Sequence, residues 1–280
     1  MSFFYAMSYF LIYAFLGWAL EVVYHVVTTG KFINRGFLNG PFCPIYGAGM
    51  LSAILLLSRF TDGLIVLYVA GVIFCTLIEL IGGFVLFKAF KMRWWDYSKE
   101  PFNLGGFICL RFSLAWGACV VVVMKIIQPI IETYVDFLDA SSLGHIAGYA
   151  VLVFVLADVV VTVLTVMKLN EDIKYIDRVA GEIRKVSDGL TDKIGVTTVK
   201  ATAKVQAGQV QAALARAEAK DELEAILKRS KGLFGYDRLL KAFPAMKSSI
   251  SNIDLPDAFD TLKNFVTRRR QEDAESEAQA

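Results

Sequence analysis

Five long apolar runs constrain this chain more than any other feature of its sequence. A helix needs about 20 apolar residues to cross a bilayer. The runs cover residues 4–27, 44–60, 64–88, 104–127 and 143–168, and the second is the shortest. The composition agrees, since 56% of the residues are hydrophobic and the mean hydropathy of +0.52 is higher than that of a typical soluble domain. The sequence therefore predicts an all-α, polytopic membrane protein with about five transmembrane helices.

The charges divide the chain into two parts. Residues 1–168 hold 10 Lys/Arg and 9 Asp/Glu, whereas residues 169–280 hold 19 and 18. Residues 1–168 are thus predicted to form a transmembrane helical domain, followed by a cytoplasmic tail. In residues 169–232, small and apolar residues recur in steps of three and four, which predicts an amphipathic helix or coiled coil, as one long helix or a bent pair. We expect residues 233–266 to form short helices on the membrane surface or against the coil, and 267–280 to be a disordered C-terminus.

Lys and Arg are distributed unequally between alternate loops. Seven lie after the first, third and fifth runs, and two, Arg59 and Lys125, lie near the other loops. The seven are Lys31, Arg35, Lys88, Lys91, Arg93, Lys99 and Lys168. Because positively charged loops stay in the cytoplasm, this bias predicts a multi-pass plasma-membrane protein with its N-terminus outside and its tail cytoplasmic.

The segment between the first two runs, residues 34–49, is too polar for hydrocarbon and too rich in Gly and Pro to continue a helix. We expect it to be one defined turn rather than a loose linker. Its structural residues are predicted to be Gly36, Gly40, Pro41, Pro44, Tyr46 and Gly47, with Pro44 in the first turn of the next helix. In the loop after the third run, Asp96 is expected to support a turn and Asn103 to cap the fourth helix.

Four ionisable residues lie inside the predicted spans: Glu21, Glu79, Arg111 and Asp158. Given the orientation, all four fall in the cytoplasmic half and are expected to share an inward-facing polar pocket. We expect Arg111 to pair with Glu79 or Glu21, as a pathway group or as an ion pair that only fixes helix register.

At the mouth of that pocket we expect four loop residues, namely Asn34, Arg35, Asp96 and Asn103. Arg35 is also within reach of Glu21.

Several chemistries find no support in the sequence. The four cysteines form no C-x-x-C pair, and the two histidines have no partners at metal-ligand spacing, so we predict no metal site and no cofactor. Phosphate-loop, G-x-S-x-G and H-E-x-x-H motifs are missing, so we predict no enzymatic activity. The balanced charge argues against nucleic-acid binding.

Several short strings carry a family resemblance. They are Gly17-Trp18 with Glu21, Asn34-Arg35-Gly36-Phe37-Leu38, Gly40-Pro41, Cys43-Pro44-Ile45-Tyr46-Gly47, Trp95-Asp96-Tyr97-Ser98 and Pro101-Phe102-Asn103. Over roughly residues 1–165 the chain resembles the type IV ABC-transporter permease family of bacterial membrane proteins. The resemblance implies a permease. The string Arg238…Ala242-Phe243-Pro244 is similar to one in family members with long tails.

The sequence is compatible with two main functions. One is a transporter subunit that sits in the lipid bilayer and works as a homo-oligomer or with a partner membrane or ATPase subunit, since five spans are few for a complete transporter. The alternative is a membrane scaffold or regulator that acts through its coiled tail. An intramembrane enzyme acting on lipid is a third reading without motif support.

Overall fold

The computed structural model describes residues 1–191, 222, 224–231, 236–248, 259–260, 263–264 and 267, with only the backbone from 177 to 191. All but the first residue of the predicted disordered end (267–280), and most of the predicted coil beyond 191, lie outside the described residues. By contact, the chain divides into one unit of residues 1–164 and 238–247 and a second of residues 165–237 and 248–280.

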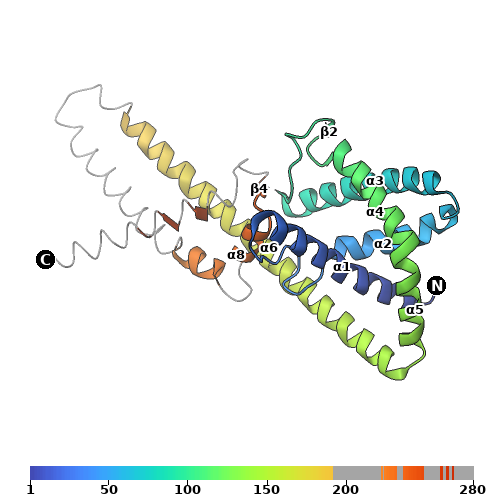
Figure 1. The fold of residues 1–280 in the computed structure, drawn as a ribbon. Coiled ribbons are helices and arrows are strands. Elements are labelled where there is room, and N and C mark those ends of the chain that lie inside the picture. Colours follow the sequence, from blue (N-terminus) through green and yellow to red (C-terminus); the bar gives the residue numbers. More distant parts are fainter. Residues whose placement is uncertain are drawn as a thin grey trace, which may run out of the picture. The chain divides into compact units, whose positions relative to one another are not determined.

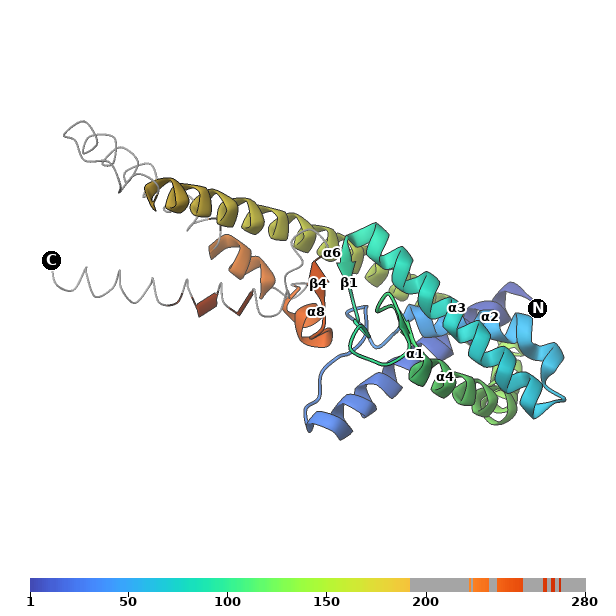
Figure 2. The same ribbon diagram turned by 90° about the horizontal axis from the view of Figure 1, so that it is seen from above.

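The predicted all-helical, polytopic fold is confirmed in the part of the chain that the structure describes. Four helices are long and apolar enough to cross a membrane. The first two are α1 (Phe3–Thr29) and α3 (Leu64–Phe90). The third is continuous and consists of α4 (Leu110–Val122), a π-helical segment (Val123–Ile127) and α5 (Gln128–Asp139). The fourth is the first part of α6 (Ser142–Thr191). Figures 1 and 2 show α1 beside α2 (Pro44–Leu57) and α3 beside α4.

The second expected span differs from the prediction. Helix α2 has 14 residues and ends in a 3-10 turn, Ser58–Phe60. At 1.5 Å per residue α2 is roughly 21 Å long, shorter than the hydrocarbon core of a bilayer. Within its described residues the structure therefore has four helices of spanning length, where the sequence predicted about five.

The fourth span is shifted along the chain. Residues 104–109, predicted to be helical, lie instead in a short hairpin of β2 (Asn103–Leu104) and β3 (Ile108–Cys109). Gly105 and Gly106 have φ of 59° and 74°, which a right-handed helix excludes. The helix consequently begins at Leu110, and its π-helical segment lies just before Pro129, which cannot donate a backbone hydrogen bond.

Helices α1 and α2 pack closely through glycines. A Cβ on Gly17 would lie 2.2 Å from Cγ of Tyr46, and one on Gly47 would lie 2.5 Å from the carbonyl oxygen of Phe10. Small residues are typical of helix contacts in membranes because they let two backbones approach. Cys43, just before α2, also donates its backbone N–H to the carbonyl of Ala14 at 2.9 Å.

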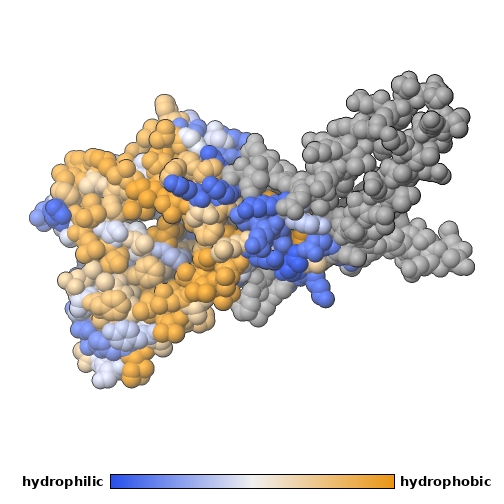
Figure 3. All heavy atoms as spheres, turned by 180° about the vertical axis from the view of Figure 1, so that it is seen from behind, coloured by the Kyte–Doolittle hydropathy of each residue, from blue (hydrophilic) through white to orange (hydrophobic). Residues whose placement is uncertain are grey.

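The outward faces of these helices are apolar. Large hydrophobic side chains such as Val27, Ile65, Ile73 and Phe154 are more than half exposed in the isolated chain. Figure 3 shows apolar side chains over much of the visible face of the spanning helices. Such a surface is stable only in lipid or against another protein.

In the second unit the described chain folds back along α6. Asp172 of α6 is buried, and its carboxylate accepts hydrogen bonds from Arg229 and from the Tyr236 hydroxyl, both at 2.9 Å. These partners are 57 and 64 residues further along the chain, so the described tail residues contact α6. Helix α6 itself runs without a break past residue 168, the predicted end of the transmembrane domain.

The close approach of α1 and α2 gives a matched pair of substitutions. Gly47→Ala should lower the free energy of unfolding by about 1–3 kcal/mol, because the added methyl group meets the Phe10 carbonyl. Gly49→Ala lies in the same helix, where the nearest atom is 3.9 Å from the new Cβ, so it should be neutral or stabilising by up to about 1 kcal/mol. Thermal unfolding in detergent checks both, and equal effects of the two would contradict the packing described.

Candidate functional site

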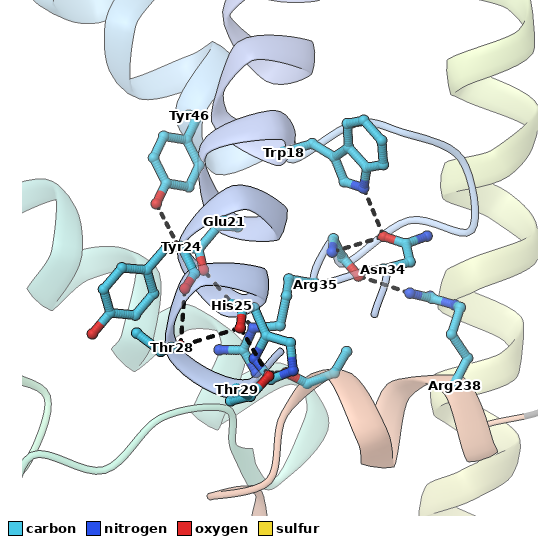
Figure 4. A network of polar contacts seen from close by, with 12 residues as sticks. Trp18, Glu21, Tyr24, His25, Thr28, Thr29, Asn34, Arg35, Tyr46 and Arg238 are labelled. Atoms are coloured by element: carbon cyan, nitrogen blue, oxygen red, sulfur yellow. Dashed lines mark hydrogen bonds and ion pairs between the residues drawn. The ribbon is translucent and has the colours of Figure 1, made fainter. Parts of the chain in front are cut away.

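The loop of residues 34–40 folds around the side chain of Asn34 (Figure 4). Its Oδ1 accepts from Nε1 of Trp18 at 2.8 Å and from the Gly36 N–H at 2.9 Å, and its Nδ2 donates to the Asn39 carbonyl at 2.8 Å. One amide thus ties the loop to α1 and closes it on itself. A short polar side chain that bonds to its own backbone two residues on is typical of a tight turn.

The other end of the loop is fixed to α6 by Asp158. Oδ1 of this carboxylate accepts from the Asn39 N–H at 3.2 Å, from Asn39 Nδ2 at 2.9 Å and from the Thr162 hydroxyl at 3.2 Å. Oδ2 accepts from the Gly40 N–H at 2.6 Å. Asp158 is only 8% exposed, and these four donors offset the cost of burying its charge.

Arg238 also binds this loop. It comes from α8 (Asp237–Ala242), and its guanidinium donates to the carbonyls of Gly36 and Phe37 at 2.8 and 2.9 Å and to Oδ1 of Asn39 at 3.2 Å. Burial lowers the pKa of Arg238, while the charge of Asp158 acts in the opposite direction. The Asn39 amide therefore bridges an anion and a cation.

Arg35 and Glu21 form an ion pair next to this loop. Arg35 Nε lies 3.9 Å from Glu21 Oε2, and Glu21 Oε1 accepts from the Tyr46 hydroxyl at 2.6 Å. Figure 4 shows the three side chains converging on α1. Of the partners that the sequence left open for Glu21, the structure shows Arg35. We refer to Trp18, Glu21, Asn34, Arg35, Asn39, Tyr46, Asp158 and Arg238 as the loop cluster.

Glu79 of α3 interacts with the Tyr97 hydroxyl. Tyr97 also interacts electrostatically with Glu21 of the loop cluster. Burial, followed by the charge of Glu79, raises the pKa of Tyr97. Oε2 of Glu79 is buried without a hydrogen-bond partner among the described residues. Glu21 and Glu79 thus each face a tyrosine hydroxyl, and Tyr97 interacts with both carboxylates.

Asp96 and Asn103 organise the loop of residues 91–109. As predicted, Asp96 supports a turn, accepting the Ser98 N–H at 3.0 Å, and it also pairs with Lys247 at 2.6 Å. Asn103 does not cap the fourth helix, because that helix begins only at Leu110. Its side chain instead bonds to backbone groups within the loop, including the Glu100 carbonyl at 2.8 Å.

The prediction for Arg111 is wrong. It pairs with Glu100 at 3.9 Å rather than with Glu79 or Glu21, and its side chain is 74% exposed. The reason is the shifted start of α4, which places Arg111 in the first turn of the helix instead of within the span. The four charges predicted to lie inside the spans therefore have separate partners: Glu21 contacts Arg35 and Tyr46, Glu79 interacts with Tyr97, and Asp158 anchors the loop.

The turn residues act through close approach rather than through unusual backbone angles. Neither Gly36 nor Gly40 has a positive φ. A Cβ on Gly40 would lie 3.1 Å from Oδ2 of Asp158, and one on Gly36 would lie 3.0 Å from Trp18. Around Pro41, the Phe42 N–H donates to the Gly40 carbonyl at 2.9 Å. Pro44 occupies the first turn of α2, as predicted.

Sequence reasoning missed several members of the site as interacting residues: Trp18, Asn39, Thr162, Arg238, Phe243 and Lys247. Trp18 and the string from Arg238 to Pro244 carried a signal only as parts of the family resemblance. Asn39 belongs to an Asn-Gly-Pro sequence that marks a turn, but nothing in it indicates that the side chain meets Asp158.

A family model described as "Putative ABC-transporter type IV" matches residues 8–163. The match includes the whole 34–40 loop and Asp158 and stops before α8. Comparisons with curated protein sequences and with solved structures found no match.

The pair of Asp96 and Lys247 gives a pH-dependent prediction. Burial raises the pKa of Asp96, but the bonds from Lys247 and Ser98 outweigh it and lower the pKa from 3.8 to about 2. Because the folded-state pKa is depressed, the pair stabilises the protein above pH 4 and loses this effect as the pH falls toward 2.

Lys247→Gln should therefore lower the free energy of unfolding at pH 7 by about 1 kcal/mol. The difference from the wild type should shrink below pH 4. Thermal unfolding at several pH values measures it, with Lys174→Gln, an exposed lysine, as control. A difference that stays constant down to pH 2 would contradict the assignment.

Proposed function

Since the chain belongs to the type IV ABC-transporter family, we propose that it is the membrane subunit of a transporter and that the loop cluster and Glu79 line or gate its solute route. The proposal gives the chain no catalytic step of its own. The energy would come from a partner ATP-binding subunit, because this sequence has no phosphate loop.

The observation that supports the proposal is a carboxylate within each of two spanning helices. Glu21 lies on α1 and Glu79 on α3, and each faces a tyrosine hydroxyl. Charged groups within membrane helices are costly, and those that persist commonly mark solute or ion pathways.

Glu79 supports this reading most directly. One of its carboxylate oxygens is buried without a hydrogen-bond partner in the described part of the chain. A purely structural role would favour full satisfaction of such an atom. A solute carrying a hydrogen-bond donor or a positive charge would satisfy it.

Arg35 offers a way to gate the route. It is held at 3.9 Å from Glu21 rather than in a short bidentate pair, and it belongs to a loop rather than to a helix. A movement of the loop would thus separate the charges and change access to Glu21. Transport proteins commonly alternate between such states by moving a few gating elements about a fixed site.

Orientation and assembly are part of the same proposal. The distribution of Lys and Arg supports an N-terminus outside and the loop cluster at the cytoplasmic side. Four spanning helices are few for a complete path, so we propose a second copy or a partner membrane subunit.

Two substitutions test the route. In cells that lack the wild-type chain, Glu79→Gln and Arg35→Gln should insert normally but reduce any solute-dependent phenotype by about tenfold or more, as expected for loss of a buried charged contact. Arg111→Gln removes an exposed charge and serves as the matched control, which should behave as the wild type.

The measurement is complementation of growth or solute uptake, with membrane insertion checked by immunoblot. Purification of the tagged full chain should also yield an ATP-binding subunit. Wild-type function in both Glu79→Gln and Arg35→Gln would exclude the proposed route.

A further inference from the structure

A short piece of the tail belongs to the membrane unit. Residues 238–247 group by contact with residues 1–164, although the chain on both sides of this piece groups with the second unit. The piece comprises most of α8 and the residues that follow, up to the start of β4 (Lys247–Ser248). We call residues 238–247 the tail latch.

The tail latch contacts both loops of the candidate site. Arg238 donates to two carbonyls of the 34–40 loop, as described above, and Arg35 donates in return to the carbonyl of Ala242. At its far end, Lys247 pairs with Asp96 of the 91–109 loop at 2.6 Å. The latch therefore connects two loops that are separated in sequence by α2 and α3.

Aromatic packing completes the contact. The Phe243 ring lies 5.0 Å from that of Trp94, edge to face, and the Arg35 guanidinium lies 6.0 Å from the centre of the Phe243 ring. Phe37 of the first loop packs on Trp94 at 5.1 Å. Arg35 is thus held by Glu21 on one side and by the latch on the other.

The latch has little stability of its own. Helix α8 has six residues, well below the length at which an isolated helix is stable in water. Its order depends on the contacts just described, so a docked and an undocked state differ by only a few interactions. Elements of this kind are common in switches.

Charge links the latch to the membrane helix. Arg238 and Asp158 bind the same loop, and the Asn39 amide bonds to both of them. Loss of either charge leaves the other buried with less compensation, which costs more than the loss of an exposed charge. Docking of the latch and anchoring of the loop on α6 are therefore coupled.

We propose that the tail latch is a regulatory element that, when docked, locks the 34–40 loop and keeps Arg35 against Glu21. When it undocks, the loop and Arg35 are released. A partner that binds the rest of the tail and favours the undocked state shifts the same equilibrium. The locking of the loop stands on the contacts alone, and only its effect on transport rests on the proposed function.

Amide hydrogen exchange of the full chain in detergent or nanodiscs tests the lock. Asn39 and Gly40 donate their N–H groups to Asp158, so they report loop opening. Arg238→Gln and Phe243→Ala should each speed exchange at these amides by about tenfold, while the amides of the α3 interior stay protected. Lys174→Gln is the matched charge control and should exchange as the wild type.

A double substitution tests the coupling. If Arg238 and Asp158 act through one loop, Arg238→Gln combined with Asp158→Asn should speed exchange by clearly less than the product of the single effects. Independent, multiplicative effects would overturn the coupling. Wild-type exchange at Asn39 and Gly40 in Arg238→Gln and Phe243→Ala would overturn the lock.

The solute transport rate distinguishes the regulatory role of the latch from the proposed transport role of Glu79. Latch variants should change the rate of solute transport by severalfold in either direction while Glu79→Gln abolishes it. Faster exchange with an unchanged transport rate would overturn regulation by the latch. Normal transport by Glu79→Gln would instead count against the proposed route and leave the exchange result standing.

Discussion

The Asp158 carboxylate and the Arg238 guanidinium both bind one short loop, and the candidate site depends on these two anchors. The loop between α1 and α2 carries peptide groups into the bundle, where unpaired polar groups cost several kcal/mol each. Asp158 takes the N–H groups of Asn39 and Gly40, and Arg238 takes the carbonyls of Gly36 and Phe37. Donors and acceptors of the same turn are thus satisfied by opposite charges.

The bonds from Asp158 and Arg238 also explain why the loop is so rich in Asn and Gly. Asn34 and Asn39 each use both ends of their amide, so that the loop is built from side-chain bonds as well as backbone bonds. Gly40 lets the backbone approach within bonding distance of Asp158, where a Cβ would be in tight contact. A rigid loop of this kind positions Arg35, and hence the partner of Glu21.

A site anchored in this way combines rigid and switchable parts. Glu21, Glu79 and Asp158 project from long helices, whereas Arg35 and Arg238 come from a loop and from a six-residue helix. In the proposed release of the tail latch, the carboxylates stay on their helices and the guanidinium groups are the partners that move. A transporter needs such a division, because a fixed site must be exposed and closed in turn. The family match stops at residue 163, so α8 adds to the family's membrane region a contact from the chain's own tail.

The sequence by itself determined most of the spanning helices and the turn that precedes Pro44. Hydrophobic length indicates the helices, and the Gly and Pro content indicates the turn. The sequence left Arg35 as only one possible partner of Glu21. It failed at α4, where two glycines in left-handed conformations moved the helix start and carried Arg111 out of the site. Only the tertiary structure decided that Asp158 contacts Asn39 and that Arg238 contacts Gly36. Arg238 and Gly36 are 202 residues apart in the sequence. Local patterns report periodicity and turns, whereas these partners are set by how distant helices pack, and no local signal encodes that choice.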